Sequence, residues 1–125
     1  MNRSIIGDTL FICDDDGTDV LTMSERLTKE RAYMMLSGNI NSECARDFED
    51  ELICLLTVKD RIMLDMGGVA YISGAGFNAL LSAQKLIDGK SGASLEIVNV
   101  SGKLMRDFDD IGFSNLLDVR EKGKN

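Results

Sequence analysis

Three consecutive aspartates near the N-terminus are the residues of this chain that most readily suggest chemistry. They lie in the segment Asp14-Asp15-Asp16-Gly17-Thr18, directly after the apolar run Leu10–Cys13. Carboxylates in such a cluster can transfer protons, attack as nucleophiles or bind magnesium. The same residues can also form a β-hairpin turn, because Asp-Gly is among the strongest hairpin signals. The remaining sequence has to decide between these two interpretations.

The segment resembles the Asp-x-Asp-Gly-Thr signature of haloacid-dehalogenase-type phosphatases. The resemblance implies that Asp14 is the nucleophile and Asp16 the general acid/base of a magnesium-dependent aspartyl phosphatase. Such an enzyme also needs a hydroxyl, a lysine and further carboxylates. The chain offers Ser73, Lys85 or Lys103, and the pair Asp109-Asp110 for these tasks. That family continues from its motif into a helix, whereas here the next helical pattern begins only near Ser42. The phosphatase therefore stays the alternative hypothesis.

The composition excludes several other classes of function. The 125 residues carry Asp+Glu 21 against Lys+Arg 14, a formal net charge of −7, and include no histidine. No basic stretch could neutralise a nucleic-acid backbone, so we expect no nucleic-acid partner. The lack of histidine removes His-based triads, His-ligated zinc and imidazole acid/base chemistry.

The sequence also does not match two loop motifs that bind ions or nucleotides. An EF-hand centred on Gly17 would place Ile12 and Met23 where carboxylates are required. A P-loop ending at residues 89–91 would place Gln84 where its first glycine belongs. We therefore expect neither a metal nor another cofactor.

The three cysteines, Cys13, Cys44 and Cys54, are odd in number and lack C-x-x-C spacing. This usage predicts reduced core residues in a cytoplasmic protein. No apolar run approaches the 18 residues of a membrane span, and the first residues lack the apolar region of a signal peptide. We expect a cytoplasmic protein without direct membrane insertion.

Strands alternate with helices along most of the chain. Strand character is found in residues 9–13, 19–26, 31–36, 61–65, 69–72, 93–98 and 116–119. Helical periods begin near Ser42, near Phe77 and after Ser101. The expected buried faces are Ala45, Phe48, Leu52, Leu55 and Leu56 in the first helix, Phe77, Leu80, Ala83, Leu86 and Ile87 in the second, and Leu104, Met105, Phe108 and Ile111 in the third. This order predicts an α/β layer structure with a mixed sheet.

Three blocks in this order closely resemble the STAS domain, specifically bacterial anti-sigma factor antagonists. The blocks are the strand Ile62-Met63-Leu64-Asp65, the loop Tyr71-Ile72-Ser73-Gly74-Ala75-Gly76-Phe77, and the helix and glycine of residues 100–113. Residues 37–41 also look like the turn that precedes the first helix of that family. The resemblance covers roughly residues 20–120.

The resemblance implies a single STAS domain over residues 19–120, with a mixed sheet of four to five strands packed with helices. Residues 1–18 would add a strand and turn as an N-terminal β-hairpin extension, and residues 121–125 a polar tail. It also implies a non-enzymatic regulator that binds an anti-sigma factor, itself a serine kinase, and that a serine phosphatase resets. A homodimer and a STAS subunit of a membrane-associated or stress-signalling assembly stay open.

The resemblance points to the loop before the second helix as the docking and phosphorylation site. Gly74 or Ala75 stands where relatives carry the acceptor serine, so Ser73 is the phosphorylation candidate, and its other role is to cap the helix. Asp65 either bonds nearby loop amides or ends its strand in solvent. The expected partner-binding residues are Asn39, Asn41, Ser73, Gly74, Ala75, Gly76, Asn78, Ser82 and Lys85.

Overall fold

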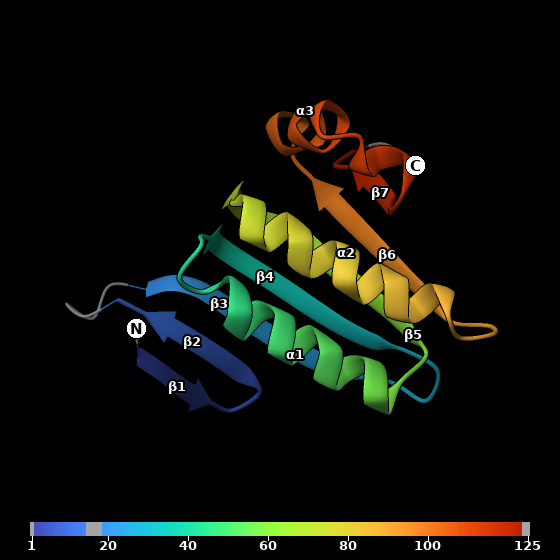
Figure 1. The fold of residues 1–125 in the computed structure, drawn as a ribbon. Coiled ribbons are helices and arrows are strands. Elements are labelled where there is room, and N and C mark those ends of the chain that lie inside the picture. Colours follow the sequence, from blue (N-terminus) through green and yellow to red (C-terminus); the bar gives the residue numbers. More distant parts are fainter. Residues whose placement is uncertain (1, 15–18, 124–125) are drawn as a thin grey trace.

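A mixed β-sheet organises the chain, and its spatial strand order follows the chain order (Figure 1). The computed structural model describes residues 2–14 and 19–123, and seven strands lie within them. Neighbouring strands are antiparallel from β1 to β4 and parallel from β4 to β7. The strands are β1 (Asn2–Ile6), β2 (Thr9–Cys13), β3 (Asp19–Leu27), β4 (Ala32–Ile40), β5 (Arg61–Ile72), β6 (Ser94–Val100) and β7 (Asp118–Glu121).

Helices connect the parallel strands. α1 (Ala45–Val58) joins β4 to β5, α2 (Gly74–Asp88) joins β5 to β6, and α3 (Gly102–Asp110) with the short 3-10 helix η1 (Phe113–Asn115) joins β6 to β7. Successive parallel crossovers of one hand place their helices on one face of the sheet. Figure 1 shows α1 and α2 side by side over that face, with α3 beyond the end of β6. The N-termini of α1 and α2 therefore lie at the same end of the sheet.

The predicted helix faces fill most of the core. All five residues expected on the inner face of α1 are buried, as are Leu104 and Phe108 of α3. Two residues expected on inner helix faces are exposed instead. Leu86 of α2 is 47% exposed, and Ile111, which follows the last turn of α3, is 45% exposed. Phe77 of α2 packs edge-to-face against Phe108, with ring centroids 5.0 Å apart. This contact joins α3 to the helical layer.

The sheet has more strands than the four to five expected from the sequence. β1 was missed because all of its five residues are exposed, so it shows no apolar alternation. β5 is one strand through Gly67 and Gly68, where the sequence suggested a break. A Cβ at Gly68 would lie 2.9 Å from the Cβ of Ser37, so β4 and β5 approach closely there and need the glycine.

The aspartate-rich segment, residues 14–18, falls between β2 and β3 in the chain. β2 and β3, which flank it, pair antiparallel, as the hairpin interpretation predicted. Asp14 follows β2 directly, whereas Asp15 to Thr18, and with them the general acid/base candidate Asp16, lie outside the described residues.

None of the three cysteines forms a disulfide, as predicted. Cys44 is a buried core residue, whereas Cys13 is half-buried and Cys54 is exposed, so the expectation of three core cysteines was wrong. Cys54 lies on the outer face of α1, one position away from the buried Leu55.

Candidate functional site

The first turn of α2 is held in place by Ser73. The Ser73 Oγ accepts a hydrogen bond from the Gly76 N–H at 3.1 Å, which is an N-cap, as the sequence suggested. The Ser73 N–H donates to the Ile40 carbonyl at 2.8 Å, so the turn is tied to the end of β4. Only 5% of the Ser73 surface is exposed. The hydroxyl therefore lies beneath the surface with its acceptor function in use.

Two glycines of this turn have opposite surroundings. A Cβ on Gly76 would lie 2.8 Å from the Cγ2 methyls of both Ile40 and Ile72, so only glycine fits without displacement. A Cβ on Gly74 would have no neighbour within 4 Å. Gly74 and Ala75 are exposed, while Gly76 is buried. The turn thus presents backbone and one methyl group at its outer side.

The start of α1 is built by two asparagines at the end of β4. The Asn41 Oδ1 accepts hydrogen bonds from the Glu43 N–H at 3.1 Å and the Cys44 N–H at 2.9 Å. The Cys44 thiol donates to the Asn39 carbonyl at 3.3 Å, and burial raises the pKa of this thiol. Asn41 therefore serves the local turn, while the Asn39 side chain is on the exposed side of β4.

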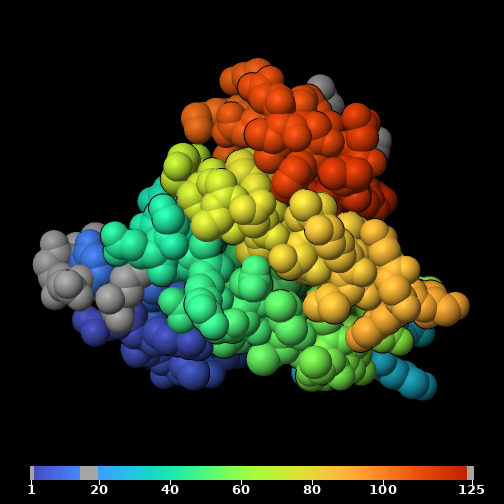
Figure 2. Space-filling view, viewed as in Figure 1, coloured from blue at the N-terminus to red at the C-terminus, as the bar shows by residue number. Residues whose placement is uncertain are grey.

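An open groove of about 440 Å³ lies between the N-terminal ends of α1 and α2. Figure 2 shows the two helices adjoining on this face of the molecule. Arg46 and Glu49 give the α1 side charges of both signs, and Asn78 gives the α2 side an amide. The N-terminal helix dipoles add partial positive charge at this end. The lining residues are Ser42, Ala45, Arg46, Glu49, Ala75 and Asn78.

A family model for the STAS domain, described as "Mlab, STAS domain", matches residues 23–118. The chain belongs to the STAS domain family. This confirms the resemblance and its approximate extent. No curated protein matches the chain.

Solved structures share the STAS fold of this chain. An anti-sigma factor antagonist from Mycobacterium paratuberculosis superposes with a TM-score of 0.74 at 13% identity, over 87% of this chain and 90% of its own. A putative anti-sigma factor antagonist from Thermotoga maritima reaches 0.72 at 16% identity, over 81% and 87%. The Bacillus protein SpoIIAA in its phosphorylated form reaches 0.61 at 11% identity, over 78% and 89%. At these identities the likeness establishes the fold.

The structure brings only part of the predicted site together at the surface of the STAS domain. Ala75 and Asn78 line the groove, and Gly74 is exposed beside Ala75. Ser82 and Lys85 continue along the same helix. Sequence reasoning missed the α1 side of the groove, although the rule that parallel crossovers align helix N-termini could have indicated it.

Asp65 lies on β5 of the STAS sheet and has a local role. Its Oδ1 accepts a hydrogen bond from the Gly67 N–H at 2.8 Å. Of the two roles left open by the sequence, the bond to nearby backbone is the one observed. The strand does not end there.

Among the described residues, the groups that a phosphatase would need are not gathered at one place in this STAS domain. Asp14 follows the second strand of the sheet, whereas Asp109 and Asp110 end the helix that follows the sixth. Lys85 is in the last turn of α2, and Ser73 is at the opposite end of that helix. In residues 2–14 and 19–123, no three acidic, cysteine or histidine side chains cluster as a metal site would require. The comparisons give the phosphatase alternative no support.

Within the same described ranges, the structure contains no helix of the length and apolarity that a bilayer crossing requires.

Proposed function

We propose that this STAS domain is a non-enzymatic regulator that docks a partner protein through the groove between α1 and α2. The observation that carries the proposal is the open groove at the paired helix N-termini, lined by small and polar side chains. Exposed Gly74 and Ala75 let a partner backbone approach closely beside it. Ser82 and Lys85 extend the docking surface along α2.

The proposed partner is an anti-sigma factor with serine-kinase activity in the cytoplasm. Family membership and the shared fold with proteins described as anti-sigma factor antagonists support this choice. The mixed charges of Arg46 and Glu49 suit a protein surface with paired charges of its own. No cofactor takes part in this docking.

We further propose that phosphorylation of Ser73 does not control the docking. A phosphate adds about −1.5 to −2 charge and three acceptor oxygens. Ser73 is 5% exposed and its hydroxyl caps α2, so a kinase could reach it only after the first turn of the helix opened. The exposed neighbour, Gly74, has no hydroxyl. SpoIIAA, by contrast, is known in unphosphorylated and phosphorylated forms.

The docking proposal is tested by measuring, with calorimetry, the affinity for a serine-kinase anti-sigma factor encoded in the same genome. Ser42→Arg places a long cation at the groove and should weaken binding at least about ten-fold, a loss of about 1.4 kcal/mol. Ser91→Arg is the matched control, because Ser91 is also an exposed turn serine but follows the opposite end of α2. Equal affinity of the two variants would show that the interface lies outside the groove.

The phosphorylation proposal is tested by intact-mass spectrometry after incubation with ATP and the same partner. We expect a stable complex without a mass change in the natural chain. Gly74→Ser places a hydroxyl in open space at the surface and should allow one phosphate to be added. A phosphate on the natural chain that disappears in Ser73→Ala would contradict the proposal.

A further inference from the structure

The outer edge of β1 is free to pair with another strand. β1 is the first strand of the sheet and pairs only with β2 among the described residues. Ile5 and Ile6 are 72% and 69% exposed, higher than any other large apolar residue described. Proteins usually protect such edges with charges, bulges, proline or very short strands, because free edges pair with other chains. β1 has no proline and no bulge in its pairing with β2, and Arg3 is its one charged residue.

The opposite edge of the same sheet is protected. β7 has four residues, and Asp118 and Arg120 form an ion pair on it at 3.4 Å. Its pairing with β6 is also irregular, with a register shift between Ile97 and Val100. The exposure of β1 is therefore a property of that edge, and the fold does not leave all its edges open.

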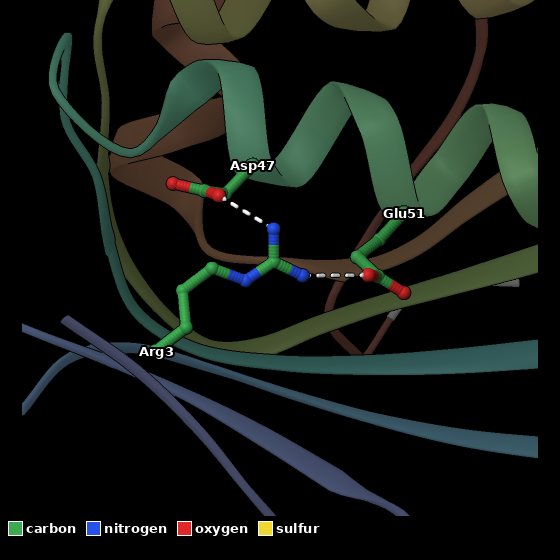
Figure 3. Close-up of polar contacts among 3 residues, drawn as sticks. All are labelled: Arg3, Asp47 and Glu51. Atoms are coloured by element: carbon green, nitrogen blue, oxygen red, sulfur yellow. Dashed lines mark hydrogen bonds and ion pairs between the residues drawn. The ribbon is translucent and has the colours of Figure 1, made fainter.

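The one charged side chain of β1 is turned away from the edge and neutralised. Figure 3 shows Arg3 reaching from β1 to two carboxylates of α1. Its guanidinium donates to Asp47 at 2.9 Å and to Glu51 at 3.0 Å. The contact ties β1 to the helical layer. It also removes the cation that would repel an identical edge.

The hydrogen-bonding pattern of β1 is self-complementary. β1 and β2 are joined by the two-residue turn Gly7-Asp8, with Ile6 opposite Thr9, so this pair is hydrogen-bonded. Because alternate residues direct their backbone groups to the same side, the N–H and C=O groups of Ser4 also face β2. Those of Arg3 and Ile5 point outward, away from β2. A twofold axis at Ser4 would pair Arg3 with Ile5 of a second copy. Each such antiparallel pair exchanges two hydrogen bonds.

We infer that β1 is a dimerisation edge, at which two copies of this chain pair antiparallel about Ser4 to form one continuous sheet. Arg3, held by α1, would lie beside Ile5 of the second copy, where its aliphatic stem covers apolar surface. The short contact makes the dimer weak. Because each copy carries a net charge of −7, added salt should strengthen association by screening the repulsion. The inference concerns a different surface from the docking groove and does not depend on it.

The test is sedimentation equilibrium of the full chain over about a hundred-fold range of concentration, at low and high salt. The natural chain should shift from one copy towards two as concentration and salt rise. Ile5→Pro removes an outward N–H that β2 does not use, at an edge position that tolerates proline. Ile5→Asp keeps that N–H but sets a carboxylate beside the second copy, where the carboxylates of Asp47 and Glu51 outnumber the guanidinium of Arg3. Both variants should weaken dimerisation at least ten-fold.

Ile111→Asp is the matched control, because Ile111 is an exposed aliphatic residue 45% open to solvent, next to α3. It should dimerise like the natural chain. A natural chain that stays monomeric throughout the range would overturn the inference. So would association that survives both Ile5 substitutions, because the interface would then lie elsewhere.

Discussion

The tight packing of the first turn of α2 can be tested by a pair of glycine substitutions. Gly76→Ala adds a methyl 2.8 Å from the Cγ2 atoms of Ile40 and Ile72. Both isoleucines are buried and β-branched, so they cannot rotate away cheaply. Such overpacking costs about 1–3 kcal/mol, and replacing a helical glycine offsets about 0.4–1 kcal/mol of it. The middle of these two ranges gives an expected net loss of about 1 kcal/mol in the free energy of unfolding.

Gly74→Ala is the control, because it makes the same replacement in the same turn where the added methyl meets nothing within 4 Å. It should be neutral or stabilising by up to about 1 kcal/mol. Urea unfolding followed by circular dichroism measures both variants, and unchanged m-values would show that only stability changed. If Gly76→Ala is as stable as Gly74→Ala, the close contact between α2 and the ends of β4 and β5 is refuted.

Three further predictions concern single side chains. Burial first, and then Glu51, raise the pKa of Glu25 to about 7. The stability that protonated Glu25 contributes is therefore complete below pH 4.5 and is lost as the pH rises through 7. Glu25→Gln should flatten this fall in the free energy of unfolding, as denaturation at several pH values would measure. Ser73→Ala removes the N-cap and should lower the unfolding free energy by about 1 kcal/mol, measured by urea unfolding, whereas unchanged stability would argue against the cap. Iodoacetamide should modify the exposed Cys54 in the native protein, but Cys44 only after unfolding. Mass spectrometry of the digested protein measures both modifications, and equal rates would contradict the burial of Cys44.

Much of the helical layer could be predicted because its signals are local. Ser73 marks the start of α2 by its own side chain, and Gly112 ends the α3 segment with a φ of 79° that favours glycine. The inner face of α1 follows a simple helical period. These features require no knowledge of distant residues, so a single sequence contains them.

The strand boundaries were harder because they depend on partners far away in the chain. Gly67 and Gly68 suggest a break, yet β5 continues because Ser37 of β4 packs against Gly68. β4 likewise continues through Gly38 to Ile40, since β3 lies close against that glycine. In both cases a neighbouring strand decides, and local propensity does not reveal it.

The candidate site likewise combines features that local sequence signals predict with features that depend on distant residues. The sequence placed Ser73 at a helix start but could not show that its hydroxyl is buried, since the burial depends on packing against the end of β4. It placed Gly76 among the partner-binding residues, whereas Ile40, 36 positions away, covers it. The groove combines residues from two helices, and only the fold brings Arg46 near Asn78.

The match between strand order and chain order has a consequence for how the protein is made. Each new strand pairs with the one synthesised just before it, and no strand has to insert between two strands already paired. The sheet can therefore grow at a single edge while the ribosome is still delivering the chain, starting from the antiparallel hairpins with their short loops. Each parallel strand is then added together with the helix that precedes it, which covers the newly extended part of the sheet.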